Sequence, residues 1–92
     1  MIILGSTGSI GVNTLNIARK FNLSVEVLVA GSNITVLNKQ IEEFKPSKVV
    51  IANKEDIPKV KHNDVSFGED EILNAIENSK SETVVNALVG FL

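Results

Sequence analysis

Three glycines near the start of the chain form the pattern that most strongly indicates a ligand-binding site. Gly5, Gly8 and Gly11 are spaced three residues apart, after the apolar residues 2–4 and at the start of a stretch with helical periodicity. A glycine at a strand end can adopt positive φ, a second lets a ligand approach the backbone, and a third lets a helix pack closely on a strand. Free N–H groups at the start of that helix would then face an anion. The placement predicts a dinucleotide-binding turn.

The spacing of this turn leaves a second interpretation open. Gly-x-x-Gly-x-x-Gly departs by one residue from the common Gly-x-Gly-x-x-Gly fingerprint. In the structural alternative, Gly5 and Gly8 only make a tight turn, Ser9 caps the helix, and Gly11 is a packing contact. We favour dinucleotide binding because the motif, the preceding strand and the following helix agree. A phosphate loop of the nucleotide-hydrolysing kind is excluded, since no Gly-Lys-Ser/Thr follows.

The end of the second apolar run indicates which dinucleotide is preferred. Gly31, Ser32 and Asn33 stand where an NAD-specific chain usually places an acidic residue for the ribose hydroxyls. A carboxylate would repel a 2′-phosphate, whereas Ser32, Asn33 and the N–H groups of the next helix could donate to it. This neutral sequence therefore favours NADP. Asn33 could equally serve as the N-cap of that helix, and the two roles are compatible.

No other residues form a comparable chemical pattern. His62 has no carboxylate or cysteine at a ligand spacing and lies in a lysine-bearing loop, so a surface position is favoured. Glu69, Asp70 and Glu71 are consecutive, and consecutive residues of a helix point in different directions. We interpret them as a first-turn charge effect rather than a metal site. We therefore predict a cofactor site in this chain but no catalytic residue and no metal ligand.

The elements that must position these residues alternate along the chain. Continuous apolar runs at residues 2–4, 27–30, 49–52 and 84–89 are typical of strands covered on both faces. Helical spacing predicts two buried helix faces, one of Ile10, Thr14, Ile17, Ala18 and Phe21, the other of Ile34, Leu37, Ile41 and Phe44. A third helix is predicted at residues 69–78, with Ile72, Leu73 and Ile76 as its buried face. Residues 65–67 could add a short strand, and residues 53–64 are ambiguous. The pattern predicts an α/β, Rossmann-like doubly wound parallel sheet with helices on both faces.

Composition and charge exclude several other classes of protein. The 92 residues include no cysteine, 43% hydrophobic residues and 22% charged residues, which fits one globular domain. The net charge of −2 gives no general attraction to nucleic acid or to an anionic membrane. No apolar stretch approaches the roughly 20 residues that cross a bilayer, and a cytoplasmic location is the default expectation. No helix follows the last strand, so we expect residues 1–92 to be an incomplete N-terminal NADP-binding domain, truncated at its C-terminal end.

Three segments together resemble the start of the 1-deoxy-D-xylulose 5-phosphate reductoisomerases, NADPH-dependent enzymes of the non-mevalonate isoprenoid pathway. The segments are residues 3–11, 29–33 and 87–90, which read ILGSTGSIG, VAGSN and ALVG. The first is characteristic of this family, and the others follow at the right separations. In many members position 32 is basic, whereas here it is Ser32. The electrostatic case for NADP is weaker as a result.

The resemblance implies a set of cofactor contacts. The pyrophosphate and the nearby ribose would be held by Thr7, Gly8, Ser9 and Ile10. The adenosine 2′-phosphate end would be met by Gly31, Ser32 and Asn33. Val89 and Gly90 match a strand end that passes close to the nicotinamide half.

The resemblance also implies the activity of the whole enzyme, which converts 1-deoxy-D-xylulose 5-phosphate to 2-C-methyl-D-erythritol 4-phosphate. By this resemblance the whole enzyme would be a homodimer that needs Mg²⁺ or Mn²⁺. It would rearrange its sugar phosphate and reduce the aldehyde intermediate with NADPH. The family's metal ligands and substrate contacts would lie beyond residue 92, so residues 1–92 alone should be inactive. Two alternatives are kept. One is the Rossmann domain of another NADP-linked reductase, such as a semialdehyde dehydrogenase or dihydrodipicolinate reductase; the other is a non-enzymatic nucleotide-sensing module.

Overall fold

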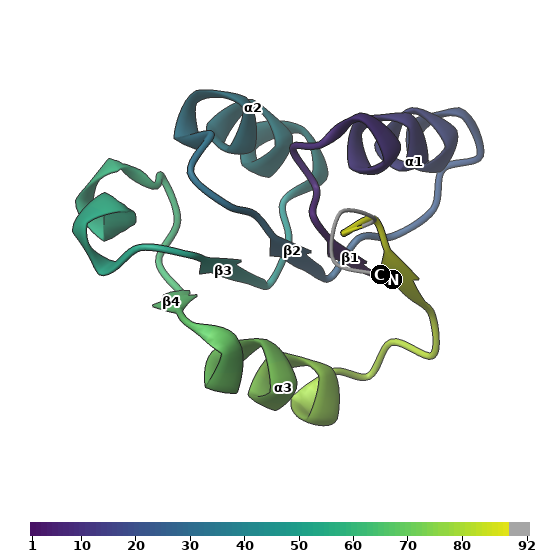
Figure 1. Ribbon diagram of the computed structural model, residues 1–92. Helices are drawn as coiled ribbons and strands as arrows, with labels where there is room; N and C mark the ends of the chain where they lie inside the picture. Colours follow the sequence, from purple (N-terminus) through teal and green to yellow (C-terminus); the bar gives the residue numbers. More distant parts are fainter. Residues whose placement is uncertain (89–92) are drawn as a thin grey trace.

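Five parallel strands form the sheet at the centre of the computed structural model, which describes residues 1–88 (Figure 1). Their order across the sheet is β4-β3-β2-β1-β5. The strands are β1 (Ile2–Leu4), β2 (Val27–Val29), β3 (Lys48–Ile51), β4 (Val65–Phe67) and β5 (Val84–Asn86). The first strand is interior, since Ile2 pairs with Val27 on one side and with Val84 on the other.

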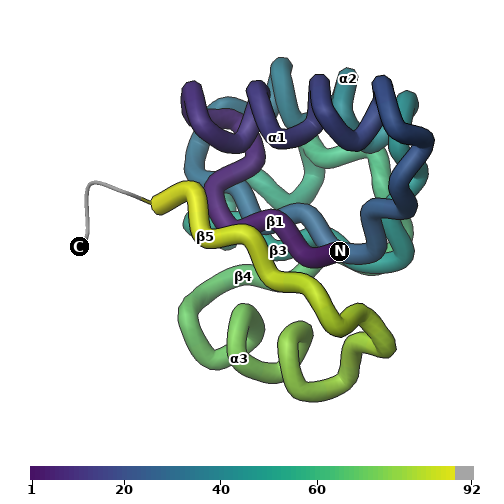
Figure 2. Tube along the Cα trace, turned by 90° about the vertical axis from the view of Figure 1, so that its right-hand side faces the viewer, coloured from purple at the N-terminus to yellow at the C-terminus, as the bar shows by residue number. Residues whose placement is uncertain are grey.

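Helices cover both faces of this sheet, as a doubly wound fold requires. Helices α1 (Ser9–Lys20) and α2 (Ile34–Phe44) lie on one face, and α3 (Glu69–Asn78) lies on the other (Figures 1 and 2). The chain steps outward from β1 to β4 and then returns through α3 to β5 on the other side of β1. Because such crossovers are right-handed, the reversal places α3 on the opposite face. The predicted fold class and order of elements are confirmed.

The ambiguous segment between β3 and β4 contains a short 3₁₀-helix, η1 (Lys54–Lys59). His62 follows it and is half-buried. Its Nε2 atom lies 2.7 Å from the carbonyl oxygen of Pro46, and its Nδ1 atom accepts a hydrogen bond of 2.9 Å from the N–H of Asp64. Both ring nitrogens are therefore used to hold this connection against the loop before β3.

The predicted buried face of α1 is wrong except at Ala18, which is buried. Ile10, Ile17 and Phe21 are exposed to 40%, 54% and 63%. The buried residues of this helix are Gly11, Leu15 and Ala18. Gly11 determines which face is buried, because the backbone of the turn approaches it so closely that this position must face the sheet. Periodicity alone cannot show this, since both stripes have helical spacing.

The other two helices follow the prediction more closely. In α2 the predicted Ile34, Leu37 and Ile41 are buried. In α3, Leu73 is 60% exposed and Ala75 is buried in its place, so that part of the prediction is wrong. Within residues 1–88, no helix is both long and apolar enough to span a membrane.

Candidate functional site

The turn between β1 and α1 is built around two glycines that no other residue could replace without strain. Gly5 has φ +87°, a conformation that L side chains rarely adopt. A Cβ on Gly11 would lie 2.1 Å from the carbonyl oxygen of Gly5. These two geometries confirm the predicted tight turn and the predicted close packing of helix on strand.

The outer edge of the same turn is open to solvent. Thr7 is half-buried, whereas Gly8, Ser9 and Ile10 are exposed. A Cβ on Gly8 would meet only the carbonyl oxygen of Gly5, at an ordinary 3.7 Å. Gly8 rather than Ser9 is the N-cap of α1, and no side chain caps the helix, so the structural alternative for Ser9 is wrong.

Backbone donors are available at this open edge. The first N–H groups of a helix have no intrahelical acceptor. Within residues 1–88, the N–H groups of Thr7, Ser9 and Ile10 donate to no protein acceptor. With the positive end of the helix dipole behind them, such groups form an anion-binding site.

The turn is joined directly to the end of β2. The N–H groups of Gly5 and Ser6 both donate to the carbonyl oxygen of Val29, at 2.7 Å and 3.0 Å. The chain then continues through Ala30 into the exposed residues Gly31, Ser32 and Asn33. The two predicted groups of contact residues therefore lie at the carboxyl ends of neighbouring parallel strands, where doubly wound sheets bind nucleotides.

The loop after β2 carries no acidic side chain. The Asn33 Oδ1 atom accepts a hydrogen bond of 3.3 Å from the N–H of Val36, which confirms that Asn33 is the N-cap of α2. The N–H of Ile34 donates to the carbonyl oxygen of Ser32 at 2.9 Å. A Cβ on Gly31 would meet nothing within 4 Å, so this side of the loop is open.

An apolar groove of about 490 Å³ lies beside this loop, and sequence reasoning missed it. Its lining comes from the ends of several strands and from the start of α3, and comprises Val29, Ala30, Gly31, Ile51, Ala52, Gly68, Glu69, Ile72 and Leu88. The one available signal is that the apolar run of β3 continues past the strand into Ala52. The flat face of an aromatic ring, such as a nucleobase, matches this lining.

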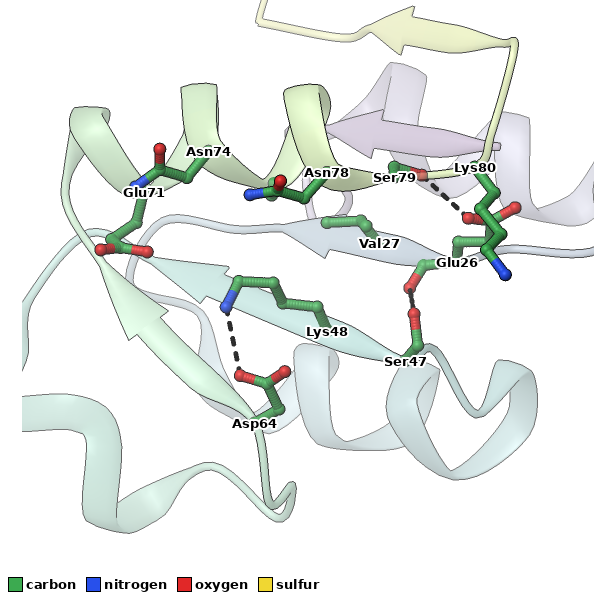
Figure 3. A pocket seen from close by; sticks show the side chains of 11 residues that line it. Glu26, Val27, Ser47, Lys48, Asp64, Glu71, Asn74, Asn78, Ser79 and Lys80 are labelled. Atoms are coloured by element: carbon green, nitrogen blue, oxygen red, sulfur yellow. Dashed lines mark hydrogen bonds and ion pairs between the residues drawn. The ribbon is translucent and has the colours of Figure 1, made fainter.

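A larger hollow of about 630 Å³ lies at the opposite edge of the sheet, between α3 and the amino ends of the strands (Figure 3). Three of its charged side chains have partners within it. The Lys48 Nζ atom lies 3.1 Å from Asp64 Oδ1, and the Ser79 hydroxyl donates to Glu26 Oε2 at 2.8 Å. We place the candidate site at the carboxyl edge, since the turn and its backbone donors are there.

The acidic residues of α3 occupy its first turn, as predicted. Across residues 1–88, no three His, Cys, Asp or Glu side chains come together in a way that could hold a metal ion. Val89 and Gly90, the residues expected near the nicotinamide half, lie outside the described residues.

Comparison with known proteins decides the family. The family model described as 1-deoxy-D-xylulose 5-phosphate reductoisomerase matches residues 1–92. The chain belongs to this family. The match favours the reductoisomerases over the two other reductase families left open by the sequence.

Two relatives in the reductoisomerase family show how far the similarity extends. The reductoisomerase of Nautilia profundicola is 54% identical over 90 residues, which cover 98% of this chain and 25% of the relative. That of Wolinella succinogenes is 50% identical over 95 residues, which cover 100% of this chain and 26% of the relative. The chain therefore spans about a quarter of the length of the curated relatives it matches.

Solved reductoisomerase structures share the fold. The Zymomonas mobilis enzyme in complex with NADPH matches 80% of this chain and 22% of its own, with a TM-score of 0.72 and 26% identity. A DOX-P reductoisomerase in complex with magnesium matches 90% of this chain and 23% of its own, with a TM-score of 0.81 and 24% identity. The likeness supports a Rossmann-like domain.

Proposed function

We propose that this chain is the NADPH-binding part of an enzyme that converts 1-deoxy-D-xylulose 5-phosphate to 2-C-methyl-D-erythritol 4-phosphate. One observation carries the proposal. A glycine turn with open backbone donors is joined, through the carbonyl oxygen of Val29, to a neutral loop at the end of β2. The Zymomonas mobilis relative in complex with NADPH supports it.

The turn after β1 would hold the pyrophosphate and the adjoining ribose. The N–H groups of Thr7, Ser9 and Ile10 are the proposed donors, and the Thr7 and Ser9 hydroxyls add two more. Gly8 contributes by lacking a side chain where the phosphates must approach the backbone. Since these groups bear no formal charge, the dipole of α1 supplies the electrostatic attraction.

The loop after β2 would hold the adenosine end. Gly31, Ser32 and Asn33 present a hydroxyl, an amide and backbone N–H groups to the 2′-phosphate, with no carboxylate to repel it. The adenine ring would lie in the apolar groove beside Gly31, against Ile51 and Ala52. NADPH supplies the hydride for reduction; the residues of this chain bind and orient it.

We propose that the rest of the protein binds the substrate and the metal and supplies the catalytic residues. We infer that residues 1–92 are an incomplete NADP-binding domain of a cytoplasmic homodimer, and that the sugar phosphate and a divalent metal bind elsewhere. Two findings support this division. The relatives are about four times as long as the chain, and residues 1–88 bring no metal-binding cluster together. Residues 1–92 alone should therefore show no turnover, with or without metal.

Calorimetric titration of the whole protein with NADPH and NADH tests the proposal. NADPH should bind more tightly, and the difference should shrink at high salt if charge is responsible. A protein that binds neither dinucleotide would refute the proposed function. A protein that binds both equally would refute the assignment of the 2′-phosphate to residues 31–33.

A further inference from the structure

Two polar side chains are buried among residues 1–88, those of Ser6 and Gln40, and the Gln40 side chain contacts the backbone of Ser6. Gln40 is on the core-facing side of α2 and only 8% exposed. Its Nε2 group donates a hydrogen bond of 2.8 Å to the carbonyl oxygen of Ser6 in the glycine turn. Nothing in the sequence pattern singles out this contact, because the two residues are 34 positions apart.

The buried position of Gln40 costs more folding free energy than an apolar residue there would. Burying an amide costs free energy unless its polar atoms are hydrogen-bonded. Here the Oε1 atom has no protein partner within the described part of the chain. Leu37 and Ile41, on the same face of α2, are buried without such a cost. The one contact Gln40 makes therefore points to a task for its Nε2 group.

That contact fixes a peptide plane at the candidate site. The carbonyl of Ser6 and the N–H of Thr7 belong to one planar trans peptide unit, so they point in opposite directions. Gln40 holds the carbonyl toward the interior. The N–H of Thr7 must then point away from the core, and it donates to no acceptor in residues 1–88.

We propose that Gln40 is a positioning residue that aims the N–H of Thr7 at the pyrophosphate of NADPH. The inference rests on the proposed function. Val29 holds the turn from β2 through the N–H groups of Gly5 and Ser6, and Gln40 holds it from α2 through the carbonyl of Ser6. Without Gln40 this peptide unit is free to rotate, and binding must then restore its orientation.

The test compares two ligands and two variants of the whole protein. Gln40→Met keeps a similar shape but removes the donor. NADPH should bind it about tenfold more weakly, the effect of losing one buried hydrogen bond. Adenosine 2′-monophosphate has no pyrophosphate and should keep its affinity to within about twofold. A purely structural role of Gln40 would weaken both ligands together.

Asn38→Leu is the matched control, since Asn38 is an amide residue on the same helix. Its side chain donates to the carbonyl oxygen of Lys59 and accepts from the N–H of Lys61, both at 2.9 Å. Those contacts face the loop after η1 and not the glycine turn. Asn38→Leu should leave NADPH affinity unchanged even if the protein becomes less stable.

The outcomes separate this inference from the proposed function. If the parent protein binds neither ligand, the proposed function fails and the role of Gln40 fails with it. If the parent binds both but Gln40→Met weakens neither, or weakens both equally, only the role of Gln40 is overturned. If Gln40→Met does not fold, the inference is tested on the parent protein by the NMR signal of the Thr7 amide. It should shift on addition of NADPH but not of adenosine 2′-monophosphate, and an unmoved signal would overturn the inference.

Discussion

A methyl group on Gly11 would lie 2.1 Å from the carbonyl oxygen of Gly5. Both sides of this contact are backbone, so neither can move aside as a flexible side chain would. The contact fixes the separation between α1 and the turn, and it fixes which face of α1 meets the sheet. The cofactor site and the packing of the first helix therefore depend on the same pair of residues.

Gly11→Ala should destabilise the fold severely, because the added methyl group forces α1 away from the turn. We expect a loss of about 3 kcal/mol in the free energy of unfolding. Urea denaturation of the whole protein measures it. Gly31→Ala is the matched control and should change stability by no more than about 0.5 kcal/mol, since its methyl group would meet nothing within 4 Å. Equal stability of the two variants would contradict the close contact.

Gly8→Val should abolish dinucleotide binding and largely spare the fold. At φ −79° and ψ 173° the backbone of Gly8 suits a β-branched residue, and the space outside it is open. The branched side chain would occupy the approach of the pyrophosphate, lowering NADPH affinity about a hundredfold or more, whereas stability should fall by about 1 kcal/mol. Calorimetry on the folded variant measures the first effect and urea denaturation the second. Unchanged affinity would mean that the turn is only structural.

Ser32→Asp should move cofactor preference toward NADH. The introduced carboxylate repels a 2′-phosphate and can accept hydrogen bonds from a ribose diol. One desolvated charge contact can change the NADPH:NADH affinity ratio by about ten- to a hundredfold. The ratio of dissociation constants, measured for parent and variant in the whole protein, tests this. A ratio that does not move would place cofactor selectivity outside this loop.

Glu43 should make stability depend on pH at the acidic end. Arg19 donates hydrogen bonds to its carboxylate across α1 and α2, which lowers the pKa of Glu43 below its ordinary value. The unfolded chain then takes up this proton at a higher pH than the folded chain. The stabilisation is therefore present above about pH 4.5 and is lost as the pH falls through the folded pKa.

Denaturation curves at neutral and acidic pH test the role of Glu43. Glu43→Gln should be less stable than the parent at neutral pH, and the difference should narrow on acidification. It should be small, because the pair is exposed. Glu42→Gln, at the preceding position of α2, leaves the ion pair intact. Its stability should change with acidification as the parent's does. A Glu43→Gln variant with the parent's full acid dependence would contradict the assignment.

The sequence predicted the parts of the fold that depend on local chemistry. Continuous β-branched runs indicated strands covered on both faces, and the parallel sheet confirms it. The bounds of α3 were predicted correctly, since Gly68 precedes an acidic first turn. The N-cap role of Asn33, one of the two roles that its residue type and position allow, is confirmed.

What the sequence could not predict depends on contacts between distant segments. The buried face of α1 is set by the approach of Gly11 to the turn. From spacing alone, the apolar stripe through the exposed Ile17 fits a buried helix face as well as the stripe through Gly11 does. Gln40 reads as a solvent-facing residue until α2 is packed behind Ser6. The apolar groove combines residues from several strand ends and from α3, so no single segment reveals it.

The central position of β1 determines the order in which the domain can be completed. This strand is synthesised well before β5, at residues 84–86, which is one of its two partners. A sheet with only parallel neighbours has no hairpin to start from, and contacts between such distant segments make folding slow. Until β5 is synthesised, one side of β1 has unpaired backbone groups. The N–H of Ala87 donates to the carbonyl oxygen of Leu4, directly before the glycine turn, so the start of the cofactor site is held in place only after β5 and Ala87 have been made.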